Sequence, residues 1–145
     1  MRLAKSIDTG LAKSNAIVIG DYGKGVITQN FLDELKALGQ RHNAWLSLDP
    51  KPIHSLDLRG LSLITPNRKE AFELAGISDT SRHTQPLKDK NLMRAAKQLL
   101  GTLELNVLLI TLGELGMLVC EPEKKPFHIP TLAREVFDVS GAGDT

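Results

Sequence analysis

The chain has 145 residues, of which 41% are hydrophobic and 24% charged, and its formal net charge is +1. This is about the length of one domain, with close to the roughly 25% of charged residues found in ordinary soluble domains. The near-neutral charge argues against nucleic acid or an anionic membrane as a partner, but it leaves a small anionic substrate open. The single cysteine, Cys120, excludes an internal disulfide framework and a cysteine-rich zinc site. Its apolar neighbours predict a buried structural thiol.

The first segment, residues 1–15, is polar and weakly patterned, and we expect a linker or the remnant of a missing N-terminal part there. No apolar run in the sequence resembles the core of a signal peptide or approaches the length of a membrane span, so we expect a cytoplasmic protein. We expect the remaining residues, 16–145, to form one partial domain.

From residue 16 onward, short apolar runs alternate with amphipathic segments. The predicted strands are residues 16–21, 44–50, 61–67 and 106–111. The predicted helices are residues 29–40 behind an N-cap at Thr28, a helix capped by Thr65 with Pro66 as its first residue and closed by Gly76, and residues 91–101 with a glycine stop. Residues 77–90 are expected to be a loop.

After the fourth predicted strand the pattern changes. Residues 113–116 predict a tight turn, and residues 117–129 predict two strands about a charged turn. Together the segments predict an α/β fold, with a mostly parallel sheet, helices on both of its faces and an antiparallel hairpin near the C-terminal end.

Polar or glycine-rich residues follow four successive predicted strands. Because ligands of such sheets bind beyond the carboxyl ends of the strands, we expect these residues to share one site. They are Asp21 and Lys24, then Asp49 and Lys51, then Asn67 and Glu70, and finally Thr111 and Gly113. Carboxylates suit sugar hydroxyls and lysines suit phosphates, although paired surface charge would also account for the lysines and aspartates.

Asn67 and Glu70 are three residues apart, so both side chains can project from the first turn of one helix. An amide and a carboxylate near a phosphate suggest a Mg²⁺ site, held directly or through water. The alternative is a solvated helix start with an acidic residue near its positive end. Thr111, Gly113 and Gly116 suggest a turn that contacts a nucleotide, and the alternative there is an ordinary hairpin turn.

The C-terminal stretch reads Ser-Gly-Ala-Gly-Asp-Thr over residues 140–145. Successive glycines let backbone N–H groups converge on an anion. Asp144 would repel that anion, but it suits a base that takes the proton from an attacking hydroxyl. The alternative is a glycine-rich turn in which the aspartate caps a helix.

The order N-x-x-E, T-x-G-x-x-G and D-x-[ST]-G-A-G-D resembles that of the ribokinase-like, PfkB-type carbohydrate kinases, and the resemblance covers residues 16–145. The stretches GDYGKGVIT, LDPK, LITPNRKEA and HIPTLAREVFDVSGAGDT are similar, more narrowly, to the kinase half of the bifunctional heptose-7-phosphate kinase/heptose-1-phosphate adenylyltransferases. Those enzymes make ADP-heptose for lipopolysaccharide.

The resemblance implies a role for each matched residue. Asp144 would be the catalytic base, beside an anion hole of Gly141, Ala142 and Gly143. The residues implied to contact ATP or its Mg²⁺ are Asn67, Arg68, Lys69, Glu70, Thr111, Gly113 and Gly116. Glu70 is implied to hold Mg²⁺ and Asp138 a monovalent cation such as K⁺. Asp21, Lys24, Asp49 and Lys51 are implied to face the sugar phosphate, although the match leaves open whether the two lysines face ATP instead.

The implied reaction is in-line transfer of the γ-phosphate of MgATP to a sugar hydroxyl, with heptose 7-phosphate as the preferred acceptor. The alternatives are a kinase of the same family for ketose phosphate, ribose or 2-keto-3-deoxygluconate, and a non-catalytic nucleotide- or sugar-binding remnant. The full-length enzyme is expected to be a homodimer, and the resemblance leaves open a fused nucleotidyltransferase domain. Members of the family are longer than this chain, so we expect a fragment truncated at both ends, marginally stable or aggregating, and inactive alone.

Overall fold

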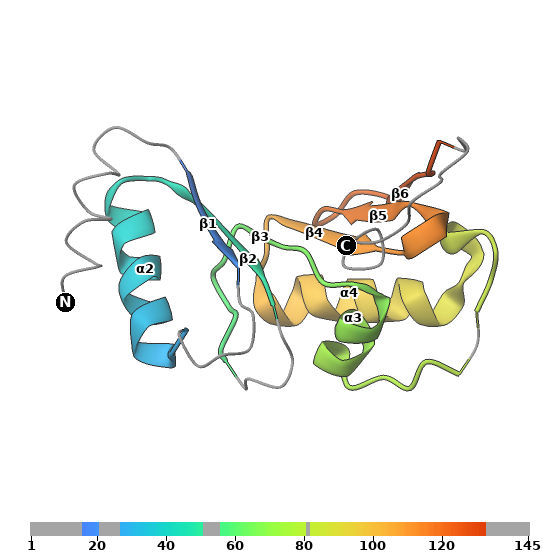
Figure 1. Cartoon of the computed structure of the whole chain (residues 1–145), viewed down its shortest axis with the longest axis horizontal. Helices are drawn as coiled ribbons and strands as arrows, with labels where there is room; N and C mark the ends of the chain where they lie inside the picture. The colour runs from blue at the N-terminus through green and yellow to red at the C-terminus, as the bar shows by residue number, and fades with distance from the viewer. Residues whose placement is uncertain (1–15, 21–26, 51–55, 81, 133–145) are drawn as a thin grey trace, which may run out of the picture.

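The computed structural model describes residues 16–20, 27–50, 56–80 and 82–132. Its strands form one six-stranded sheet in the order β1-β2-β3-β4-β5-β6 (Figure 1). They are β1 (Ala16–Gly20), β2 (Trp45–Asp49), β3 (Leu63–Ile64), β4 (Val107–Thr111), β5 (Met117–Cys120) and β6 (Phe127–Ile129). Neighbours from β1 to β4 pair in parallel, and β5 and β6 add an antiparallel hairpin. The predicted mostly parallel sheet with a hairpin near its C-terminal end is confirmed.

In the described part of the chain, three α-helices accompany the sheet: α2 (Gln29–Arg41), α3 (Arg68–Ala75) and α4 (Lys90–Leu103). Short 3-10 turns, η1 (Pro86–Lys88) and η2 (Gly113–Leu115), precede α4 and follow β4. Thr28 caps α2 as predicted, because its hydroxyl accepts a hydrogen bond from the backbone N–H of Phe31 at 3.1 Å. Gly76 closes α3 in the left-handed conformation, also as predicted.

Two predicted helix boundaries are wrong. The N-cap of α3 is Asn67, not Thr65, because Thr65 directly follows β3 and still donates its backbone N–H to the carbonyl of Leu48 in β2 at 3.2 Å. The helix α4 continues through Gly101 to Leu103, and Glu104 takes the left-handed closing conformation instead. A glycine inside a helix costs only about 1 kcal/mol, and Leu103 gains contact with the core by staying helical.

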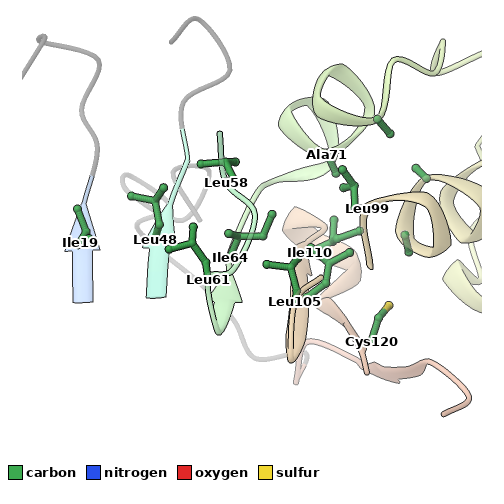
Figure 2. Packing of buried hydrophobic residues seen from close by; sticks show 14 of the residues in the cluster. Ile19, Leu48, Leu58, Leu61, Ile64, Ala71, Leu99, Leu105, Ile110 and Cys120 are labelled. Atoms are coloured by element: carbon green, nitrogen blue, oxygen red, sulfur yellow. The ribbon is translucent and has the colours of Figure 1, made fainter. Parts of the chain in front are cut away.

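The core lies on one face of the sheet. The pairing register puts Leu48 beside Ile64, Ile64 beside Leu108, and Leu108 beside Cys120, so their side chains share that face. Figure 2 shows Leu48, Ile64 and Ile110 pointing into a common cluster with Leu99 of α4. Each of these α-helices contributes buried apolar residues to the same cluster, among them Leu32 of α2, Phe72 of α3 and Leu99 of α4.

Within the described residues, the opposite face of the sheet has no helix packed on it. Val18 is 81% exposed and Trp45 is 39% exposed, and the register puts both on this face. The predicted coverage of both faces is therefore not found in this part of the chain. The physical reason is the strand order: right-handed crossovers that always step in the same direction place every connecting helix on the same side.

Cys120 is buried, and burial alone raises the pKa of its thiol to about 11. The predicted structural thiol is confirmed, since such a group is protonated and unreactive at neutral pH. In the described part of the chain, every helix is too short or too polar to cross a bilayer.

Candidate functional site

A cleft of about 320 Å³ opens at the carboxyl ends of β2, β3 and β4, and we call it the strand-end cleft. Its lining residues are Asp49, Thr65, Asn67, Glu70, Leu109, Thr111 and Met117. It lies on the face of the sheet opposite the core, because Leu109 and Thr111 alternate with the buried Leu108 and Ile110 along β4. The structure therefore brings together predicted site residues from three of the four strand ends.

The link between Asn67 and Glu70 is a pair of reciprocal hydrogen bonds. The Asn67 side-chain oxygen accepts from the backbone N–H of Glu70 at 2.8 Å, and Glu70 Oε1 accepts from the backbone N–H of Asn67 at 2.9 Å. This capping box starts α3 and fixes the rotamers of both side chains. Glu70 is only 8% exposed, so the alternative of a solvated helix start is wrong. The same pair both begins the helix and lines the cleft.

Thr111 ends β4 directly opposite Asn67. The two residues form a parallel bridge, and the Thr111 backbone N–H donates to the carbonyl of Pro66 at 3.0 Å. The Thr111 hydroxyl is buried and has no hydrogen-bond partner among the described residues. Because buried hydroxyls are normally paired, this group is suited to a bound ligand.

The charge of the strand-end cleft comes from Asp49 and Glu70, and none of its described lining residues is basic. A pair of carboxylates with nearby hydroxyls favours a hard cation over a bare phosphate. No described residues form a group of three or more His, Cys, Asp or Glu side chains that could hold a metal ion. The donors thus fit Mg²⁺, which keeps several of its waters and needs only one or two carboxylates.

The predicted nucleotide turn is the 3-10 turn η2 and its closing glycine. Gly113 and Gly116 both have positive φ, 61° and 90°, which disfavours other residues. A Cβ on Gly116 would overlap the carbonyl oxygen of Ile129 and lie 2.9 Å from Pro130 Cα. Neither glycine lines the cleft. The turn itself explains why both positions need glycine, and contact with a nucleotide stays a prediction.

Arg68 and Lys69 do not line the cleft either. The Arg68 guanidinium donates to both oxygens of Asp79, at 2.9 and 2.8 Å, and lies 2.9 Å from Asp89 Oδ2. Its hydrogen bonds to Asp79 raise the pKa of Arg68 and lower the pKa of Asp79. Lys69 is exposed on the first turn of α3.

Several predicted site residues lie outside the described residues, so their roles stay predictions. They are Asp21, Lys24, Lys51, Asp138, Gly141, Ala142, Gly143 and Asp144.

Sequence reasoning missed three residues of the cleft, Thr65, Leu109 and Met117. One of them carried a usable signal: Leu109 precedes Thr111 by two residues on one strand, so it shares the face of Thr111. Met117 is the antiparallel partner of Thr111, which only the hairpin register reveals.

The model of the pfkB family of carbohydrate kinases matches residues 10–145. The bifunctional protein HldE of Geotalea uraniireducens is 42% identical over 134 residues, which are 92% of this chain and 26% of that protein. HldE of Haemophilus influenzae is 32% identical over 143 residues, or 99% of this chain and 28% of that protein. The chain thus spans about a quarter of the length of the curated relatives it matches.

Solved structures show the same fold at low sequence identity. Phosphofructokinase-2 from Escherichia coli, in complex with substrates and products, has a TM-score of 0.73 and 20% identity, and the match covers 97% of this chain and 45% of that chain. Arabidopsis thaliana ribokinase, complexed with ribose and ATP, has a TM-score of 0.71 and 18% identity, with 96% and 42% covered. The predicted ribokinase-like fold class is confirmed.

Proposed function

Because the chain belongs to the pfkB family of carbohydrate kinases, we propose that it forms the nucleotide-side part of an enzyme that transfers the γ-phosphate of MgATP to a sugar hydroxyl. One observation carries the proposal: Asp49, Asn67, Glu70 and Thr111, from three strand ends, line one cleft. A site at the carboxyl ends of a mostly parallel sheet is where ligands bind in such folds.

The described residues supply positioning and charge. The capping box holds the Glu70 carboxylate at the start of α3, and we expect Glu70 and Asp49 to hold Mg²⁺ through its waters. A bound Mg²⁺ would neutralise charge on the transferring phosphate. The Thr111 hydroxyl, buried without a partner among the described residues, would donate to a phosphate oxygen. Such reactions depend on positioning and charge neutralisation.

The transfer step itself is assigned to residues outside the described part of the chain. We propose that Asp144 takes the proton from the acceptor hydroxyl as that oxygen attacks the γ-phosphorus and the bond to ADP breaks. The backbone N–H groups of Gly141, Ala142 and Gly143 would stabilise the transferring phosphoryl oxygens. Asp138 would hold a monovalent cation nearby. Asp21, Lys24 and Lys51 are proposed to contact the sugar phosphate.

We further propose heptose 7-phosphate as the acceptor, which gives the 1,7-bisphosphate of ADP-heptose synthesis. This rests on the stretches GDYGKGVIT and LDPK, and on the 42% identity to a protein named HldE. In that setting the whole enzyme would be a cytoplasmic homodimer with a fused nucleotidyltransferase domain.

The test is a phosphoryl-transfer assay on the complete reading frame that contains this chain, with four acceptors. They are heptose 7-phosphate, fructose 6-phosphate, ribose and 2-keto-3-deoxygluconate. We expect heptose 7-phosphate to have the highest kcat/KM. Asp144→Asn should lower kcat by roughly 10²–10⁴ while ATP still binds, because only proton removal is lost. A matched change at the exposed Asp33 of α2, Asp33→Asn, should have no effect. Transfer to none of the acceptors would favour a non-catalytic binding protein.

A further inference from the structure

Arg68 lies beside the strand-end cleft without lining it, and its contacts join the beginnings of two helices. It is the first residue of α3, and its chain neighbour Asn67 is the N-cap that lines the cleft. Its guanidinium donates bidentate hydrogen bonds to Asp79, at 2.9 and 2.8 Å, and lies 4.9 Å from the centre of the Phe72 ring. The planar group is thus held from its edge by a carboxylate and from its face by an aromatic ring.

The third contact of Arg68 reaches a different helix. Asp89 is the N-cap of α4: its Oδ1 accepts from the backbone N–H of Leu92 at 3.1 Å. Its other oxygen, Oδ2, lies 2.9 Å from Arg68, and the Asp89 side chain is only 1% exposed. One buried carboxylate therefore joins the beginnings of α3 and α4. We call Arg68, Asp79 and Asp89 the helix-start cluster.

The helix-start cluster matters because α3 is short. An eight-residue helix has little stability of its own, so its position depends on tertiary contacts. Ala71, Phe72 and Ala75 anchor one side of α3 in the core. They leave its N-terminal end, where Asn67 and Glu70 face the cleft, to be fixed by the capping box and by Arg68.

We propose that Arg68 is a positioning residue, which holds Asn67 and Glu70 at the strand-end cleft by tying the start of α3 to Asp79 and to the start of α4. The proposal rests on the proposed function only for what those two residues bind. It differs from the expectation that Arg68 contacts ATP, which stays a prediction, and it rests on the contacts of Arg68 with Asp79 and Asp89.

The test is amide hydrogen exchange, residue by residue and without nucleotide, on the product of the complete reading frame that contains this chain. In Arg68→Met we expect the N–H groups of Asn67 and Glu70 to exchange about tenfold faster, because the start of α3 opens locally. The amides of Leu108 and Ile110 in β4 should keep their relative protection. In Arg68→Lys the exchange rates of these two amides should lie between those of Arg68→Met and the unaltered protein, because a lysine keeps the charge but cannot form bidentate hydrogen bonds. It also serves as the reporter if Arg68→Met does not fold.

The matched control is Arg59→Met. Arg59 makes the same bidentate contact with Asp57, at 3.0 and 2.8 Å, but its side chain is 64% exposed and its partner lies in the same loop, outside α3. It should leave exchange at Asn67 and Glu70 unchanged. Equal exchange in Arg68→Met and the unaltered chain would overturn the proposal, and so would a uniform increase that includes β4. Absence of kinase activity would refute the proposed function without altering this result.

Discussion

The two faces of the sheet carry opposite kinds of surface. Under α2, α3 and α4, Leu48 is 1% exposed and Ile64 is fully buried. On the other face Val18 is 81% exposed, and the strand-end cleft opens there with Asp49, Glu70 and Thr111. Along each strand the two kinds of residue alternate, so neighbours in sequence belong to different environments.

The two faces therefore have different roles: one stabilises the fold and the other carries the candidate site. The face under the helices supplies the apolar contacts that hold the described residues together. The other face supplies the polar groups that suit a ligand. Substitutions on the first face should therefore unfold the protein, and substitutions around the cleft should alter binding at modest cost in stability.

The largest expected effect is on the covered face. Leu108→Ala removes a fully buried side chain and should lower the free energy of unfolding by about 2–5 kcal/mol. Val18→Ala, on the exposed face of β1, should change it by no more than about 0.5 kcal/mol. Urea unfolding followed by circular dichroism measures both, and equal losses would contradict the separation of the two faces.

Two glycines should respond in opposite directions to the same change. Gly116→Ala adds a Cβ that overlaps the backbone of Ile129 at a φ of 90°, so we expect a loss of about 1–3 kcal/mol. Gly101→Ala adds a Cβ in open space inside α4 and should stabilise the protein by about 0.5–1 kcal/mol. Thermal melting distinguishes them, and a neutral Gly116→Ala would show that the turn relaxes easily.

Substitutions that remove the two helix caps should cost the same stability but differ in their effect on MgATP binding. Asn67→Ala and Thr28→Ala each remove a capping side chain and should each cost about 1 kcal/mol. Only Asn67 lines the cleft, so only Asn67→Ala should weaken MgATP binding, measured by calorimetry on the complete reading frame. Equal binding by both variants would remove Asn67 from the site.

The last expected effect is the pH dependence of the stability that the ion pair between Arg68 and Asp79 contributes. Arg68 lowers the pKa of Asp79 below its usual value of 3.8, so the folded state favours the ionised carboxylate. That stabilisation is complete above the unfolded pKa and is lost as the pH falls through the folded pKa. Asp79→Asn should therefore cost about 1 kcal/mol at pH 6 and progressively less below pH 4. Urea midpoints at pH 6, 4 and 3 test this, and a constant difference would contradict the assigned ion pair.

Much of the fold could be predicted because local signals agreed with the tertiary structure. Thr28 and Gly76 have side chains or backbone freedom that specify helix ends directly. Thr65 and Gly101 misled because tertiary contacts decided those ends: Thr65 pairs with β2, and the core retains the turn beyond Gly101. That the described helices all cover one face of the sheet could not be predicted from the sequence, since it depends on strand order.

The site was predictable to the extent that it sits on strand ends. Asp49, Asn67, Glu70 and Thr111 meet because parallel strands end at one edge. The ion pairs of Arg68 could not be predicted, because its partners, Asp79 and Asp89, lie in a segment without periodic pattern, and only the folded chain brings them to α3.

The central claim is that the strand-end cleft receives MgATP through Glu70, and its most direct test is a pair of substitutions on one helix. Glu70→Gln keeps an acceptor for the Asn67 N–H, so the capping box survives while the charge is lost. Glu73→Gln removes the same charge from the exposed side of α3. In the complete reading frame, calorimetry should show MgATP binding at least about tenfold weaker for Glu70→Gln, a change of roughly 1.4 kcal/mol, and unchanged for Glu73→Gln. Unaltered binding in Glu70→Gln, or equal weakening in both variants, would contradict the claim.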